Sequence, residues 1–64
     1  MFSREHFART LEHVLSSEAR VAAHYESVLE EVEDPGLRLA LVALRQEVVR
    51  RTQILHRLLG RLDR

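Results

Sequence analysis

The sequence predicts an all-α fold: an antiparallel hairpin of two long helices that self-associates into a four-helix bundle, as a homodimer or a higher oligomer. Two observations predict the hairpin. Apolar residues recur with heptad spacing in both halves of the chain, and a single Asp34-Pro35-Gly36 break separates the halves. A third observation predicts self-association, because a chain of 64 residues without cysteine cannot enclose a core between two helices or close a disulfide. We expect one domain, residues 1–64.

The first helix is expected over about residues 3–33. Ser3 is a suitable N-cap, and Glu5 places a carboxylate in the first turn, where the helix dipole favours negative charge. No Pro or Gly interrupts the segment before residue 35. Acidic residues crowd its far end, where the dipole disfavours them, so this end is expected to fray. These acids are Glu30, Glu31 and Glu33.

The second helix is expected over about residues 36–61, after a turn at 34–36. Asp34 is the expected N-cap of this helix, and Pro35 suits a first helical position because its missing N–H needs no partner there. Arg61 complements the negative end of the helix dipole near its C-terminus.

Each predicted helix carries a seam of residues at alternating spacings of four and three, the pattern of coiled coils and bundles. In the first helix the seam is Phe7, Leu11, Val14, Glu18, Val21, Tyr25, Val28 and Val32. In the second helix it is Leu37, Leu41, Leu44, Val48, Arg51, Leu55, Leu58 and Leu62. We expect the apolar members of both seams to form the core of the bundle. A neighbouring stripe consists of Ala8, Leu15, Ala22 and Leu29.

Each seam has one charged member, Glu18 in the first helix and Arg51 in the second. When the chain folds at the turn, Val32 meets Leu37, and the same register brings Glu18 opposite Arg51. A carboxylate in a core requires a partner, since an isolated buried charge is too costly. We therefore expect a buried core ion pair between Glu18 and Arg51, within one chain or between chains, that fixes the register of the bundle.

The stretch Leu15–Leu59 resembles the helical hairpin of the ferritin-like family, especially its encapsulated-ferritin and rubrerythrin type. In that family an inward Glu lies about two helical turns before a Tyr, a short Asp-containing turn follows, and the next helix carries Glu-x-x-His. Glu18, Tyr25 and Asp34 match the first three features. The resemblance implies a di-iron site, which in encapsulated ferritins forms across a subunit interface.

The expected Glu-x-x-His ligands are missing from the second half. Alignment from Glu18 places Val48 and Arg51 at these positions, and a shift of one residue gives Glu47 and Arg50. A guanidinium cannot ligate iron, and its charge disfavours a cation. The resemblance therefore implies a degenerate metal site, in which the positive charge of Arg51 replaces the metal beside Glu18. No metal is the preferred expectation, and iron held by Glu18 and Glu47 is the alternative.

The favoured function is a non-catalytic oligomeric module, which is a scaffold, an adaptor or a regulatory protein. Its expected partner is a second copy of the chain, and an unidentified protein is a further candidate partner. The alternative is an iron-binding ferritin-like protein with an atypical inter-subunit carboxylate site, which would be ferroxidase-like if it were an enzyme. No catalytic residues are identified, and no motif for nucleophilic catalysis or phosphate binding occurs.

Nucleic-acid binding is a second and less favoured alternative, because the charge is segregated along the chain. Residues 1–36 hold three Arg and eight acids, and residues 37–64 hold seven Arg and two acids. The Arg-rich second helix lacks interleaved aromatic residues, and the acidic first helix would repel phosphates. No apolar run is long enough to span a bilayer, the N-terminal residues carry charges, and cysteine is absent. We expect a cytoplasmic protein without membrane contact.

Overall fold

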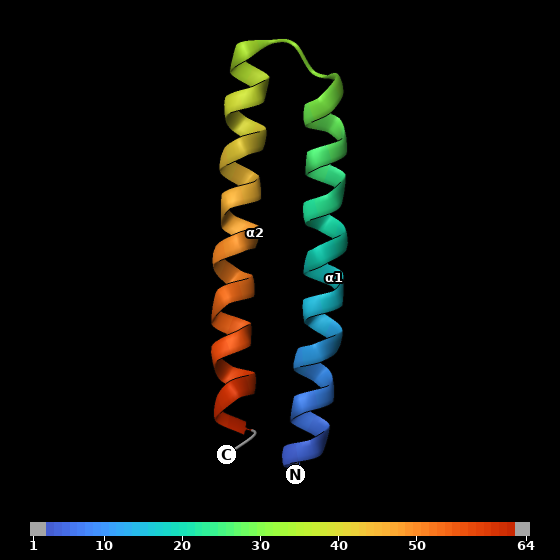
Figure 1. Cartoon of the computed structure of the whole chain (residues 1–64), viewed down its shortest axis with the longest axis vertical. Helices are drawn as coiled ribbons and strands as arrows, with labels where there is room; N and C mark the ends of the chain where they lie inside the picture. The colour runs from blue at the N-terminus through green and yellow to red at the C-terminus, as the bar shows by residue number, and fades with distance from the viewer. Residues whose placement is uncertain (1–2, 63–64) are drawn as a thin grey trace.

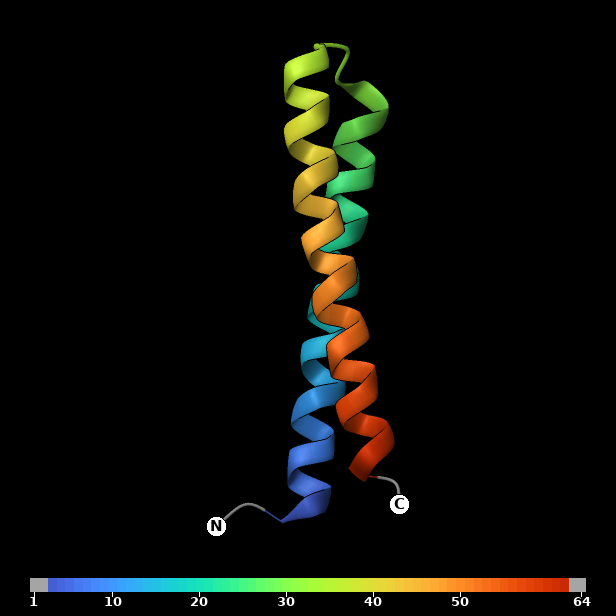
Figure 2. The same cartoon turned by 90° about the vertical axis from the view of Figure 1, so that its left-hand side faces the viewer.

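The chain forms two long α-helices packed side by side in opposite directions, as the sequence predicts. The structure is a computed structural model that describes residues 3–62. Helix α1 spans Arg4–Glu31 and helix α2 spans Pro35–Leu62 (Figure 1). The hairpin is a rod of 47 × 17 × 15 Å with the start of α1 and the end of α2 at one end and the turn at the other (Figures 1 and 2). Neither helix contains an apolar segment long enough to cross a membrane.

Both predicted N-caps are present. The Ser3 hydroxyl accepts a hydrogen bond from the backbone N–H of His6 at 3.0 Å. The Asp34 carboxylate accepts one from the backbone N–H of Leu37 at 2.9 Å, and Pro35 is the first residue of α2. These bonds satisfy N–H groups that have no partner within the helix, so the caps set where each helix begins.

The C-terminal end of α1 is held by an arginine of α2. Helix α1 ends at Glu31, two residues before its predicted limit, and has no basic residue in its last turn. The Arg38 guanidinium instead donates hydrogen bonds from Nη1 to the backbone carbonyls of Leu29 and Val32, the latter at 2.8 Å. A cation at this position satisfies free carbonyls and opposes the negative end of the dipole, despite the surrounding acids.

Substitution of Arg38 by Ala is expected to loosen the last turn of α1 and to lower the free energy of unfolding by about 1 kcal/mol. The matched control is Arg50→Ala, which removes an exposed arginine from the same helix. Hydrogen–deuterium exchange measures the effect directly, with faster exchange at residues 29–33 in Arg38→Ala only. Equal exchange in the two variants would show that Arg38 does not hold this helix end.

The interface between the helices is rotated relative to the predicted seam. The three buried side chains of residues 3–62 are Leu11, Leu29 and Val48. Leu29 belongs to the neighbouring stripe, whereas Val28 of the predicted seam is 43% exposed. The buried and half-buried positions of α1 and its C-cap include Ala8, Leu11, Leu15, Glu18, Ala22, Tyr25, Leu29 and Val32. Those of α2 include Leu41, Val42, Arg45, Val48, Thr52, Leu55, Leu59 and Leu62.

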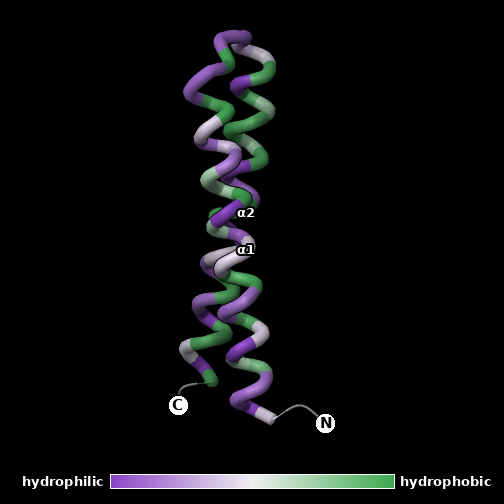
Figure 3. Tube along the Cα trace, turned by 90° about the vertical axis from the view of Figure 1, so that its right-hand side faces the viewer, coloured by the Kyte–Doolittle hydropathy of each residue, from purple (hydrophilic) through white to green (hydrophobic). Residues whose placement is uncertain are grey.

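Half of the predicted seam therefore faces the other helix, and half does not. Leu11 and Val48 are buried, and Tyr25, Val32, Leu41, Leu55 and Leu62 are half-buried. The other apolar seam residues lie at the surface of the hairpin: Phe7, Val14, Val21, Val28, Leu37, Leu44 and Leu58. Their place in the core of a larger bundle stays a prediction. Figure 3 shows that apolar and polar residues alternate along the whole length of both helices.

Candidate interaction face and central ion pair

One side of the rod carries two parallel rows of exposed apolar side chains, which we call the apolar face. It consists of Phe7, Val14, Val21 and Val28 from α1, and Leu37, Leu44 and Leu58 from α2. Within each row the residues recur at intervals of seven, with Arg51 in the one place of the α2 row without an apolar residue. These apolar side chains remain between 37% and 58% exposed. Heptad spacing keeps each row in line along its helix.

The two rows lie on the same side because the helices are antiparallel. Each row residue except Leu37 directly precedes an interior position: Val28 precedes Leu29 in α1, and Leu58 precedes Leu59 in α2. In an antiparallel pair, positions that precede interior ones in both helices flank the interface on the same side. A surface groove supports this placement, since Val14 of one row and Arg51 of the other line it together, beside Ile54.

The opposite side of the rod is different in character. Exposed Glu12, Ala19, Glu26 and Glu33 follow interior residues of α1 and its C-cap, and exposed Glu5 continues the same seven-residue spacing. Four carboxylates along this edge leave no continuous apolar row on α1 here. Exposed apolar residues elsewhere, such as Leu39 and Val49, are single side chains outside the two rows. Such isolated residues are common on protein surfaces, whereas a contiguous row is typical of an interaction site.

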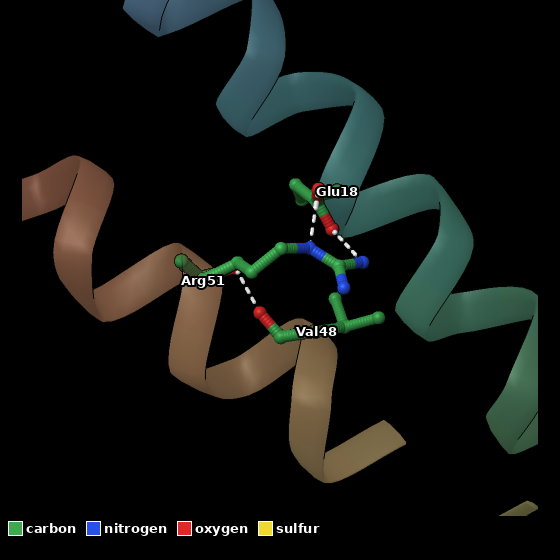
Figure 4. A network of polar contacts seen from close by, with 4 residues as sticks. Glu18, Val48 and Arg51 are labelled. Carbon is green, nitrogen blue, oxygen red and sulfur yellow. Dashed lines mark hydrogen bonds and ion pairs between the residues drawn. The ribbon is translucent and has the colours of Figure 1, made fainter. Parts of the chain in front are cut away.

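The predicted ion pair is present at the middle of the rod. Arg51 donates from Nε to Oε1 of Glu18 and from Nη2 to Oε2 of Glu18, both at 3.0 Å (Figure 4). This bidentate geometry is typical of a planar guanidinium group that pairs with a carboxylate. The hydrogen bond with Glu18 raises the pKa of Arg51 above its ordinary value, and desolvation opposes this with a smaller effect. Arg51 therefore remains a cation.

The expectation that this pair is buried is not supported in the hairpin. The Glu18 side chain is 16% exposed, but that of Arg51 is 51% exposed. The reason is the rotation of the interface. Glu18 occupies an interior position of α1, whereas Arg51 lies in the α2 row of the apolar face and reaches inward across Val48 to meet it. Solvent around Arg51 weakens the contribution of the pair to stability.

Substitution of Glu18 by Gln is expected to lower the melting temperature at low ionic strength, and the difference from the parent protein should shrink in 1 M NaCl. Gln retains a hydrogen-bond acceptor for Arg51 but loses the charge, and salt screens exposed charges. The measurement is thermal unfolding followed by circular dichroism at the two salt concentrations. The control, Glu12→Gln, removes a charge from the opposite edge. An equal shift in both variants would argue against a specific Glu18–Arg51 contribution.

Both oxygens of the candidate metal ligand Glu18 accept hydrogen bonds from Arg51. The other candidate, Glu47, is exposed on α2. Among residues 3–62, no three His, Cys, Asp or Glu side chains gather in a group that could hold a metal ion. Comparisons with protein families, with curated proteins and with solved structures find no match to this chain. The chain therefore belongs to the class of antiparallel two-helix hairpins by its fold.

Three polar residues of α2 hold positions that the sequence analysis did not single out. Arg45 and Thr52 are half-buried at interior positions, and the Thr52 hydroxyl donates a hydrogen bond to the Val48 carbonyl at 2.8 Å. Arg38 caps α1, as described above. The interior positions 41, 45, 48, 52 and 55 of α2 are also separated by alternating steps of four and three residues, as in a heptad repeat. This second set of heptad positions is not evident from the sequence pattern, because its residues Arg45 and Thr52 are polar.

Proposed function

We propose that this chain is a non-catalytic assembly module whose hairpin pairs with a second copy through the apolar face to form a four-helix bundle. The observation that carries the proposal is the pair of heptad-spaced apolar rows on one side of the rod. Bundles of two hairpins bury such rows in a common core. The opposite, Glu-lined edge then faces solvent, as the outside of a bundle requires.

The exposed area of the hairpin supports association with a copy. The chain exposes 5350 Å², whereas a compact monomer of 7.5 kDa is expected to expose only about 4200 Å². The excess of about 1100 Å² is comparable to the roughly 800 Å² that each partner buries in a typical stable interface. A second copy placed on the apolar face would also cover Arg51 and so shield its ion pair with Glu18.

The test is the mass of the protein in solution. Sedimentation equilibrium across micromolar concentrations is expected to give about 15 kDa, twice the 7.5 kDa of one chain. Helical content measured on the same samples should fall on dilution together with the dimer. A fully helical species of 7.5 kDa at every concentration would contradict the proposal.

A module of this kind acts as a scaffold, an adaptor or a regulatory dimer, since such a module provides a binding surface and does not catalyse a reaction. The competing iron-binding alternative is distinguished by metal content. The purified protein is incubated anaerobically with Fe²⁺, desalted and analysed by mass spectrometry, with Glu18→Ala as the control. Stoichiometric iron in the parent protein that is lost in Glu18→Ala would contradict the assembly module and would support an inter-subunit carboxylate site for iron.

A further inference from the structure

The charge of the hairpin is separated along its length as well as between its helices. Each helix has 28 residues, so the middle of the rod falls between residues 17 and 18 in α1 and between 48 and 49 in α2. The turn half, residues 18–48, carries three Arg and seven acids, a net charge of −4. The open half, residues 3–17 and 49–62, carries six Arg and two Glu, a net charge of +4.

Two arrangements about a two-fold axis bring the apolar faces of two copies together. If the axis runs along the rod, both turns lie at the same end of the bundle. If it crosses the rod at its middle, the turns lie at opposite ends. The first arrangement places −4 beside −4 and +4 beside +4, whereas the second places each acidic half beside a basic half. Like charges at one level disfavour the first arrangement, and unlike charges favour the second.

The charges of individual helices lead to the same result. With the turns together, the acidic half of α1 and the turn, residues 18–34 with a net charge of −5, would lie beside the adjacent half of the partner's α2, residues 35–48, which is only +1. The two segments 18–34 would also face each other across the diagonal of the bundle, about 14 Å apart for neighbouring helices at about 10 Å. Even with screening over about 8–10 Å, this repulsion exceeds the weak attraction between neighbours.

With the turns at opposite ends, α1 lies along the partner's α1, but the acids of one copy do not meet those of the other. The first half of α1, residues 3–17, has two Arg and two Glu and is neutral. The acidic half of each α1 then lies diagonally across from the α2 half that holds Arg50, Arg51, Arg57 and Arg61. The lengthwise charge pattern is therefore complementary to itself only in this orientation.

We infer that the partner of the apolar face is a second copy packed head to tail, with the two turns at opposite ends of the bundle. This inference rests on the proposed function and adds the orientation of the copies. The two-fold axis then crosses the rod beside Glu18, and the Glu18–Arg51 pairs of both copies meet at the same level. The ends of the bundle each combine one acidic turn half with one basic open half.

The experiment is an inter-copy distance measurement on spin-labelled protein, for which the absence of cysteine allows single labelling sites. Gly60→Cys is a suitable site because a Cβ atom there would meet no atom within 4 Å beyond its chain neighbours and the adjacent backbone of its own helix. Gly60 lies near the open end, so head-to-tail packing separates the two labels by about 35 Å along the rod at 1.5 Å per residue. Packing with the turns together would bring them within about 25 Å.

A crossed pair of labels gives the reverse expectation. Leu39 is 74% exposed and lies outside the apolar face, on the turn half of α2. In mixed dimers, labels at Leu39→Cys and Gly60→Cys should approach within about 25 Å if the copies pack head to tail, since the sites then lie at nearly the same level. A short distance between two Gly60→Cys labels would overturn the orientation alone. The absence of any inter-copy distance would overturn the proposed dimer as well.

Discussion

Substitution of Val21 by Glu is expected to convert the proposed dimer into monomer and to reduce the helical content of the protein. Val21 lies near the middle of the apolar face and is 38% exposed in the hairpin. In the bundle a carboxylate at this position would be desolvated in both copies without a designed partner, which is costly. We expect the dissociation constant to rise at least about 100-fold, equivalent to about 2.7 kcal/mol. The released hairpin should then unfold, because it buries so few side chains.

The matched control is Ala19→Glu, which adds the same charge to the same half of the rod. Ala19 is exposed and lies on the opposite edge, among the glutamates of α1. Sedimentation equilibrium and circular dichroism on both variants should show an unchanged dimer for Ala19→Glu and a monomer of low helicity for Val21→Glu. Dimers of equal stability in the two variants would show that the apolar face is not the interface.

The helix limits and the register of the hairpin could be predicted from the sequence because they depend on local chemistry. Ser3 and Asp34 cap helices wherever they precede a helical segment, and Pro35 fixes where the second helix begins. The length of the turn then determines which residues of the two helices lie at the same level. The contact between Glu18 and Arg51 could therefore be predicted by counting residues from the turn along each helix.

The rotation of each helix about its own axis could not be predicted in the same way. Apolar residues fill three heptad positions in α1, such as Val28, Leu29 and Val32, and only two of the three can face a single neighbour. The structure places Leu29 and Val32 inside and leaves Val28 outside. In α2 the interior positions include the polar residues Arg45 and Thr52, so an apolar pattern does not identify the side of the helix that faces α1. A helix with apolar residues at three heptad positions has no single seam for the sequence pattern to indicate.

The same ambiguity explains the exposure of Arg51. Apolar neighbours at seven-residue spacing, Leu44 and Leu58, made its position resemble the interior of the hairpin. They are themselves 47% and 38% exposed, so Arg51 shares their row on the apolar face. The long side chain compensates by reaching back to Glu18, which is why the predicted contact is present although the predicted burial is not.

Truncation of Leu29 to Ala is expected to be among the most damaging single changes inside the hairpin. Leu29 is 6% exposed, and only Leu11 and Val48 share its degree of burial among residues 3–62. Loss of a buried Leu side chain costs about 2–5 kcal/mol, since contacts disappear and a cavity remains. A domain of this size has only about 3–5 kcal/mol of stability to lose. The variant should therefore be largely unfolded at 25 °C.

Urea denaturation of Leu29→Ala and of the neighbouring exposed variant Glu30→Ala tests this expectation. Glu30→Ala removes a carboxylate from the disfavoured end of α1 and should leave the transition midpoint unchanged or slightly higher. Leu29→Ala should show no folded baseline at micromolar concentration. Because Leu29 lies in the stripe beside the predicted seam, a large loss of stability here would also confirm the rotation of α1. A cooperative transition at the parent midpoint would instead place Leu29 outside the packed interface and restore Val28 as the inward residue.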